Sequence, residues 1–216
     1  DPVNVNRIME IANKLTPEQP GCGAGVELAC VELNCRRQGI AFHEYLGGAI
    51  EDKVLFNGWV GQLPPDEAAA DAKDFVDAGF KSMKIKVGNE VDKDSARVMA
   101  IRDAVGPGIN LRMDANQQCS VDQALALCSA VKSCDMQLFE QPIAKEDLEG
   151  LARVRREGGI AIMADEAISD HQSLINVIKA DCADYIKFGI KQAGGLLPAS
   201  KMLATAEAAG LKVVLG

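Results

Sequence analysis

The chain has 216 residues, with 31 acidic against 23 basic residues and a formal net charge of −8. This length allows one large α/β domain or two small ones, and 48% hydrophobic residues are enough to bury a core. Lysines and arginines are interspersed with acids, so no basic patch suits a nucleic acid or an anionic membrane surface. We therefore expect a globular protein with no nucleic-acid partner and no membrane partner.

The sequence also predicts a cytoplasmic protein. No apolar run approaches the roughly 20 residues that cross a bilayer, and the first residues, DPVNVNRIMEIANK, lack a signal-peptide core. The seven cysteines form an odd set without paired CxxC spacing. This usage is typical of reduced, mostly buried thiols and disfavours a structural zinc site.

Short β-type runs alternate with amphipathic stretches along most of the chain. The expected strands are 53–59, 82–87, 110–114, 137–141, 161–165, 184–188 and 212–215. Each gap between them is long enough for one crossover helix. Pro64-Pro65-Asp66 begins one such helix, Gly79 ends it, and Gly210 ends the last. Strand, helix and strand repeating about every 25 residues predict a parallel sheet.

An open doubly wound sheet and a closed (β/α) barrel both fit this alternation. A doubly wound nucleotide-binding fold needs a glycine-rich turn after its first strand, but here GWVGQLPPDE follows instead. A barrel carries its chemistry at the C-terminal ends of many strands, and polar residues fall there in this chain. We therefore predict an α/β fold, a (β/α) TIM-type barrel with seven of its eight strands visible.

Each expected strand from the second to the sixth ends in a charged residue. In chain order these residues are Lys84 and Lys86, then Asp114, Glu140, Asp165 and Lys187. From Lys86 onward they are 28, 26, 25 and 22 residues apart, which is one βα unit each time. Their side chains should therefore converge at one end of the barrel.

Three carboxylates gathered in a partly dry cavity repel one another, and their pKa values rise. A hard divalent cation relieves this repulsion. Ligation by oxygen alone favours Mg²⁺, with Mn²⁺ as the alternative, and the lack of His or Cys in the set disfavours zinc. Helix capping combined with lysine pairing explains any one acid, but not three at one level of adjacent strands. Asn116 and Glu166 lie just beyond the ligand positions and are interpreted as orienting or capping residues.

The lysines predict acid–base chemistry. Lys84 and Lys86 are two residues apart on one strand, so their side chains point the same way. Two like charges depress each other's pKa and favour a neutral amine, which can act as a base. Lys187 enters four strands further on, so a substrate carbon could have one amine on each face. His43 and His171 lie away from the seventh strand and are interpreted as surface or capping residues.

The motifs KIKVG, MDAN, FEQP, ADEA and IKFG, in this order and spacing, resemble the muconate lactonizing enzyme subgroup of the enolase superfamily. The segment AGVELACVELNCRRQGIAFHEYLGG is similar to the one that leads from that family's N-terminal capping domain into its barrel. The resemblance implies that residues 1–50 are the end of the capping domain with a lead-in helix ending at Gly39. Residues 51–216 would then be the barrel domain without its eighth strand, and most of the capping domain is absent.

The resemblance also implies a role for each clustered residue. Asp114, Glu140 and Asp165 would bind Mg²⁺, Lys86 and Lys187 would be the acid/base pair, and Lys84 would tune Lys86 and contact the substrate carboxylate. The family's lysine on the sixth strand precedes a Gly-Gly pair by five residues, whereas Lys187 precedes Gly194-Gly195 by seven. Lys191 is therefore a rival of Lys187.

The predicted reaction is Mg²⁺-dependent abstraction of a proton α to a carboxylate, giving a metal-stabilised enediolate. Racemisation, epimerisation or cycloisomerisation would follow, with two opposed lysines favouring a 1,1-proton transfer. The alternatives are β-elimination on the same scaffold, a Schiff-base lysine aldolase, and a non-catalytic truncated relative. The expected partner is a small carboxylate substrate, and the resemblance implies a homo-oligomer.

Overall fold

The computed structural model describes residues 3–17 and 19–216, which form two compact units. The larger unit consists of Leu55–Ile168 and Ile175–Lys187. The smaller unit consists of the segment that ends at Val54, together with Ser169–Leu174 and Phe188–Gly216. Within the described residues, no helix is long and apolar enough to cross a membrane.

A parallel sheet forms the centre of the larger unit. Its strands follow the order of the chain, and each pairs with the next in parallel. They are β1 (Gly58–Val60), β2 (Ser82–Lys86), β3 (Asn110–Asp114), β4 (Met136–Glu140), β5 (Ile162–Ala164) and β6 (Tyr185–Phe188), of which only Phe188 is assigned to the smaller unit. The expected parallel order is therefore confirmed.

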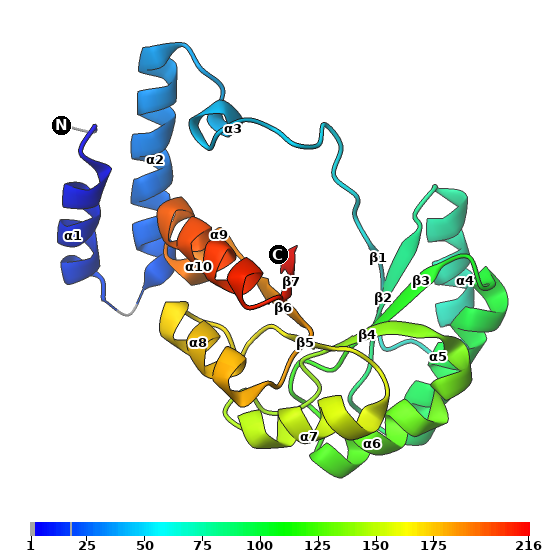
Figure 1. Ribbon diagram of the computed structural model, residues 1–216. Coiled ribbons are helices and arrows are strands. Elements are labelled where there is room, and N and C mark those ends of the chain that lie inside the picture. The colour runs from blue at the N-terminus through cyan, green and yellow to red at the C-terminus, as the bar shows by residue number, and fades with distance from the viewer. Residues whose placement is uncertain (1–2, 18) are drawn as a thin grey trace. The chain divides into compact units, whose positions relative to one another are not determined.

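Helices join successive strands and cover one face of this sheet (Figure 1). They are α4 (Pro65–Asp77), α5 (Val91–Val105), α6 (Val121–Ala130) with the 3-10 turn η1 (Lys132–Cys134), and α7 (Leu148–Gly158). The residues of α8 (His171–Ala180), between β5 and β6, are divided between the two units. This alternation of strands and crossover helices is that of an α/β fold.

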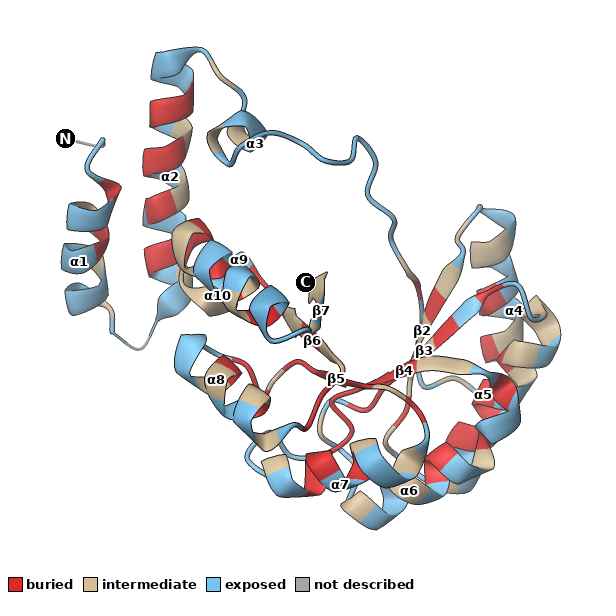
Figure 2. Cartoon of the chain, viewed as in Figure 1, coloured by how far each residue is buried: buried red, intermediate tan, exposed pale blue. Residues whose placement is uncertain are grey.

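The two faces of the sheet differ in chemistry, because successive side chains of a strand point in opposite directions. In β2, Met83 and Ile85 are fully buried, and Lys84 and Lys86 alternate with them. Figure 2 shows buried residues gathered on β4 and β5 and on parts of α5, α6 and α7. One face therefore packs under the helices, and the other is left to carry polar side chains.

The ladder between β3 and β4 shifts its register after Leu111, where β4 has one extra residue, Gln137. A β-bulge of this kind re-aims the side chains that follow it. Arg112 Nε donates a hydrogen bond to Gln137 Oε1 over 2.6 Å. After the bulge, Asp114 pairs with Glu140.

The smaller unit is mostly helical. Its elements are α1 (Val5–Leu15), α2 (Pro20–Gln38), α3 (Phe42–Tyr45), α9 (Ile190–Ala193), α10 (Leu196–Ala208) and β7 (Lys212–Leu215). The carboxylate of Glu27, which is 1% exposed, accepts hydrogen bonds from the backbone N–H groups of Leu196 and Leu197 at the start of α10. This carboxylate therefore caps the N-terminus of α10 from the side of α2.

Several expectations about elements need correction. The first strand was expected at 53–59, but β1 covers only Gly58–Val60, because its ladder with β2 has only three residue pairs and 53–56 are exposed. The helices α1 and α9 were not expected. The lead-in helix is confirmed as α2, which ends at Gly39 in the left-handed conformation, with φ 69°. All seven cysteines are free and five are buried, as expected.

Candidate functional site

Three lysines and three carboxylates from five neighbouring strands come together in the larger unit. Lys84 and Lys86 lie on β2, Asp114 ends β3, Glu140 ends β4, Asp165 follows β5, and Lys187 lies on β6. We call these six residues the charged cluster. The structure thus brings together all six residues that the strand-end spacing indicated.

The ladders of β2, β3 and β4 explain one half of the cluster. Lys86 pairs with Asp114, and Asp114 pairs with Glu140, so these residues stand at one level of the sheet. Lys84 Nζ lies 2.7 Å from both Asp114 Oδ2 and Glu140 Oε1, and Lys86 Nζ lies 2.5 Å from Asp114 Oδ2. Two ammonium groups therefore share one oxygen of the Asp114 carboxylate.

Lys187 closes the other half of the cluster. Ala164 pairs with Ile186, so the residues that follow these two, Asp165 and Lys187, come side by side. Lys187 Nζ lies 2.8 Å from Asp165 Oδ2 and 2.8 Å from Glu140 Oε1. Burial disfavours the charge on Lys187, but the hydrogen bonds to Asp165 and Glu140 outweigh it and raise the pKa of this amine.

The carboxylates are almost completely withdrawn from water. The exposed fraction of the side chain is 0% for Asp114 and 2% for Glu140. Burial raises the pKa of Asp114, but hydrogen bonds from Lys84 and Lys86 outweigh it, and the net shift is downward. Burial, followed by the negative charge of Asp114, raises the pKa of Glu140 despite its lysine partners. Negative charge at Glu140 is therefore incompletely balanced, and a further cation would be favourable there.

Asn116 and Glu166 form a polar bridge beside the cluster. Lys86 Nζ donates a hydrogen bond to Asn116 Oδ1, and Asn116 Nδ2 donates to Glu166 Oε1 over 2.9 Å. The backbone N–H of Asn116 donates to Asp114 Oδ1 over 2.9 Å. The other oxygen, Glu166 Oε2, is buried without a hydrogen-bond partner. An unpaired buried oxygen of this kind calls for a donor or a cation from outside the protein.

The donor set matches a hard divalent cation in chemistry, because the carboxylates of Asp114, Glu140 and Asp165 supply only oxygen. The ammonium groups of Lys84 and Lys187 lie between neighbouring carboxylates in this structure. Among residues 3–17 and 19–216, no three His, Cys, Asp or Glu side chains converge closely enough to form a metal cage by themselves. The orphaned Glu166 oxygen and the incompletely balanced Glu140 charge are nevertheless the features that a cation would satisfy, so the residues fit such an ion.

Two polar residues near the cluster were not found from the sequence. Arg112 Nε bonds the bulged Gln137, and burial lowers the pKa of this guanidinium. Gln141, directly after Glu140, is completely buried and bonds the backbone of the turn that follows β5. A lone glutamine inside FEQPI carries no pattern that separates it from a loop residue. Three-dimensional placement was needed to find it.

The rival lysine and the histidines lie elsewhere. Lys191 is exposed on α9, whereas it is Lys187 that bonds Glu140 and Asp165. His43 is exposed on α3, and the ring of His171 bonds Thr205 Oγ1 over 2.8 Å. Both histidines therefore behave as the surface or capping residues that were expected.

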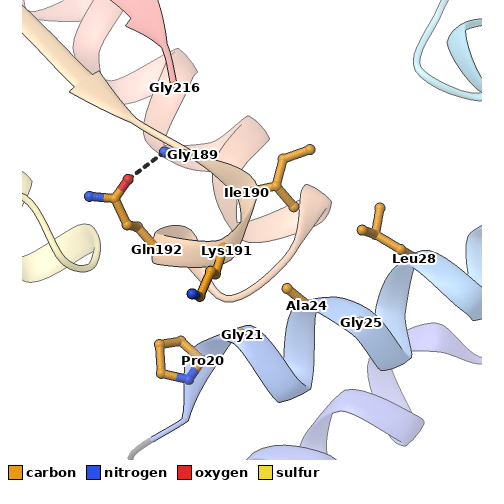
Figure 3. A pocket seen from close by; sticks show the side chains of 10 residues that line it. All are labelled: Pro20, Gly21, Ala24, Gly25, Leu28, Gly189, Ile190, Lys191, Gln192 and Gly216. Carbon is orange, nitrogen blue, oxygen red and sulfur yellow. Dashed lines mark hydrogen bonds between the residues drawn. The ribbon is translucent and has the colours of Figure 1, made fainter.

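Lys191 borders a hollow of about 820 Å³ in the smaller unit, between the start of α2 and α9 (Figure 3). Small residues of α2, Gly21, Ala24 and Gly25, form one wall, and the start of α9 with the preceding Gly189 forms the other. A Cβ atom at Gly21 would come within 3.1 Å of the Lys191 side chain. Lys191 is the only ionisable side chain among the described residues that line this hollow. Among the described residues that line the hollow, Lys191 therefore has no carboxylate side chain beside it that could hold a metal ion near a substrate acid.

Comparison with known proteins shows which family model and which relatives the chain matches. The family model described as "Enolase C-terminal domain-like" matches residues 67–216. The hydrophobic dipeptide epimerase of Enterococcus faecalis is 34% identical over 216 residues, which cover 100% of this chain and 61% of that protein. Muconate cycloisomerase 1 of Acinetobacter baylyi is 28% identical over 217 residues, covering 100% of this chain and 59% of that protein.

The fold of this chain is also similar to that of a solved structure. It is the dipeptide epimerase of Enterococcus faecalis complexed with Mg and the dipeptide L-Leu-L-Tyr. This chain matches it with a TM-score of 0.95 and 33% identity, over 100% of this chain and 61% of that one. The chain thus spans about three fifths of the length of the relatives it matches.

Proposed function

The chain belongs to the Enolase C-terminal domain-like family, and from this membership we propose that it removes the proton α to the carboxylate of a small substrate. The enediolate that results is then reprotonated, so the net reaction is racemisation or epimerisation. The observation that carries this proposal is the charged cluster, in which Lys84 from β2 and Lys187 from β6 both reach the buried Glu140 carboxylate, and Lys86 reaches Asp114.

Asp114, Glu140 and Asp165 would hold Mg²⁺ or Mn²⁺, which supplies Lewis-acid stabilisation of the charge that develops on the substrate carboxylate. Lys86 Nζ takes the α-proton from one face of the substrate carbon, and Lys187 Nζ delivers a proton to the other. Lys84 orients Lys86 through their common partner, Asp114, and neutralises part of the substrate's charge.

Epimerisation is favoured over the other reactions on this scaffold because two amines on separate strands allow exchange of one proton for another at a single carbon. Similarity to a hydrophobic dipeptide epimerase supports dipeptides as the first substrates to test. Cycloisomerisation is the second candidate, supported by similarity to muconate cycloisomerase 1. A Schiff-base aldolase needs one reactive lysine and would leave the gathering of the Asp114, Glu140 and Asp165 carboxylates unexplained.

The test is exchange of the α-proton in deuterated water, followed by NMR for both epimers of hydrophobic dipeptides in the presence of Mg²⁺. The unmodified protein should exchange both epimers and interconvert them. Lys187→Ala should abolish interconversion, because one face has lost its amine, while Lys86 still exchanges the proton of one epimer. Lys86→Ala should also abolish interconversion, but it should exchange the α-proton of the other epimer.

Lys191→Ala is the matched control, since it removes an exposed lysine from α9. It should leave interconversion within twofold of the unmodified protein. Mn²⁺ binding, measured by electron paramagnetic resonance, should persist in Lys187→Ala. Interconversion that survives in Lys187→Ala, or is lost in Lys191→Ala, would contradict the assignment of Lys187.

A further inference from the structure

Gln141 has an unusual position for a side chain without charge. It directly follows Glu140, is 0% exposed, and has φ 32°, in the left-handed region that non-glycine residues rarely occupy. Such a conformation persists only where surrounding contacts hold it in place. The contacts of Gln141 therefore indicate what its conformation serves.

Both the oxygen and the nitrogen of the Gln141 side-chain amide are hydrogen-bonded. Its Oε1 accepts hydrogen bonds from the backbone N–H of Asp165 over 3.0 Å and of Ala167 over 3.1 Å, and its Nε2 donates to Ile143 O over 3.0 Å. Asp165, Glu166 and Ala167 form the turn that follows β5. Gln141 thus bonds the backbone on both sides of Glu166.

The backbone of Gln141 adds two further connections. Its N–H donates to Met163 O over 2.8 Å, and its carbonyl accepts from the backbone N–H of Gln117 over 2.8 Å. One residue therefore joins the segments that follow β3, β4 and β5. The first two of these segments directly follow Asp114 and Glu140, and the third begins with Asp165.

The turn after β5 needs such support, because β5 ends at Ala164 and the ladder with β4 has only two residue pairs. Beyond that ladder, the side-chain Oε1 of Gln141 replaces the strand partner for two N–H groups. The same turn carries Glu166, whose Oε2 is buried without a partner. A turn that keeps an unpaired buried oxygen in place has to be held by other bonds.

We propose that Gln141 is a positioning residue, which fixes the Asp165–Ala167 turn so that the Asp165 carboxylate stays within the charged cluster and the Glu166 carboxylate stays beside it. The proposal rests on the proposed function, since it assigns Gln141 to the geometry of a divalent-cation site. Outer partners that orient metal ligands typically change metal affinity 10- to 100-fold when they are removed.

The test compares Gln141→Met, which keeps side-chain length but loses both polar groups, with Gln117→Met. Gln117 is the matched control because its Oε1 also accepts a backbone N–H bond, from Lys145 over 3.1 Å, outside the turn. Two quantities are measured on the full chain: amide hydrogen exchange without metal, by NMR, and the Mn²⁺ dissociation constant. Gln141→Met should accelerate exchange at Asp165 and Ala167 at least tenfold and weaken Mn²⁺ binding at least tenfold.

Gln117→Met should leave both quantities within twofold. Unchanged exchange at Asp165 and Ala167 in Gln141→Met, or unchanged Mn²⁺ affinity, would overturn the proposal.

If Gln141→Met does not fold, Gln141→Glu is the second variant to test, because its side chain still offers oxygen acceptors to both N–H groups. It should keep their exchange within threefold, and loss of protection in a folded Gln141→Glu would refute the role. If the unmodified protein does not bind Mn²⁺, the proposed function is rejected. The amide exchange rates at Asp165 and Ala167 then still test whether Gln141 holds the turn.

Discussion

Asp114 shows how single side chains set the charge balance of the cluster. Its fully buried Oδ2 is shared by the ammonium groups of Lys84 and Lys86, while its Oδ1 accepts the backbone N–H of Asn116. Removing one member of such a group leaves a buried charge without compensation. The identity of these residues was predictable from their spacing at strand ends, because this spacing can be read directly from the amino-acid sequence.

The contacts between residues were less predictable. Nothing in the sequence shows that Lys84 reaches Glu140 as well as Asp114, since that depends on the twist of the sheet and on side-chain conformation. Gln141 was missed for a similar reason. Its partners are the N–H groups of Asp165 and Ala167, more than 20 residues away in the chain, and backbone partners leave no residue-type signal.

The buried thiol of Cys128 should make the free energy of unfolding depend on pH. Burial raises the pKa of its thiol from 9.0 to about 12. Between these values the unfolded chain binds fewer protons than the folded one, so the free energy of unfolding falls as pH rises, by up to about 1.4 kcal/mol per pH unit. Below pH 9 this contribution is constant. Urea unfolding of Cys128→Ala should therefore show a shallower decline between pH 9 and 11.

Ser129→Ala is the control, because it changes an exposed neighbour that does not titrate. It should keep the slope of the unmodified protein. Equal slopes for Cys128→Ala and the unmodified protein would show that this thiol ionises as readily in the folded state as in the unfolded chain.

At the scale of elements, a buried ion pair ties α5 to the end of β2. Arg97 Nη1 donates to Asp94 Oδ1 over 2.6 Å and to Lys86 O over 3.1 Å. Asp94 Oδ2 accepts the backbone N–H groups of Gly88 and Asn89, over 2.8 and 2.9 Å. The first turns of α5 thereby hold the segment that carries Lys86.

Arg97→Met should lower the free energy of unfolding by about 3–5 kcal/mol, because it leaves the buried Asp94 carboxylate without its cation. Urea denaturation measures the change. Lys93→Met on the same helix removes an exposed pair with Glu90 and should cost less than about 1 kcal/mol. The double variant Asp94→Asn and Arg97→Met should recover part of the loss. Similar values for Arg97→Met and Lys93→Met would contradict this account.

The existence of the strands was more predictable than their limits. The limits of β3 and β7 agree with the expected 110–114 and 212–215. The apolar run 53–59 was misinterpreted because periodicity cannot reveal whether a partner strand is present, and only three residues of β1 pair with β2. Asn4, whose side chain caps α1, was an available start signal for that helix.

At the scale of the whole molecule, the predicted enolase-superfamily barrel domain is confirmed, because the family model matches 67–216 and the fold matches a dipeptide epimerase with a TM-score of 0.95. The strand-helix period carried this prediction, since parallel strands in chain order leave few alternative topologies. The grouping of residues 169–174 and 188–216 with the N-terminal segment was not expected, because it depends on packing between distant segments. The homo-oligomer, the cytoplasmic location and the boundary near residue 50 stay predictions.

If the carboxylates hold a divalent cation, the folded protein should be stabilised by it. A ligand that binds only the folded state adds about 2.7 kcal/mol at 100 times its dissociation constant. For a protein of this size, Mg²⁺ should then raise the melting temperature by about 5–10 °C, and a chelator should reverse the shift. Scanning calorimetry at matched ionic strength measures it.

Asp165→Asn should reduce this Mg²⁺-dependent shift to a small fraction, since it removes one of three proposed ligand charges. Asp184→Asn is the control, because Asp184 pairs with Arg155 instead of the cluster lysines. A shift of equal size in the Asp165→Asn protein would place the cation elsewhere.

The bulge at Gln137 has a consequence for how this scaffold tolerates change. If the ladder stepped evenly from Leu111 and paired Gln137 with Arg112, Phe139 would come beside Asp114 and the Glu140 carboxylate would turn beneath the helices. Deletion of Gln137 would straighten the ladder and still leave Glu140 beside Asp114, whereas an even ladder that kept Gln137 would replace this acid by an aromatic ring in the charged cluster. The position of the Glu140 carboxylate therefore depends on the bulge as well as on the acid itself.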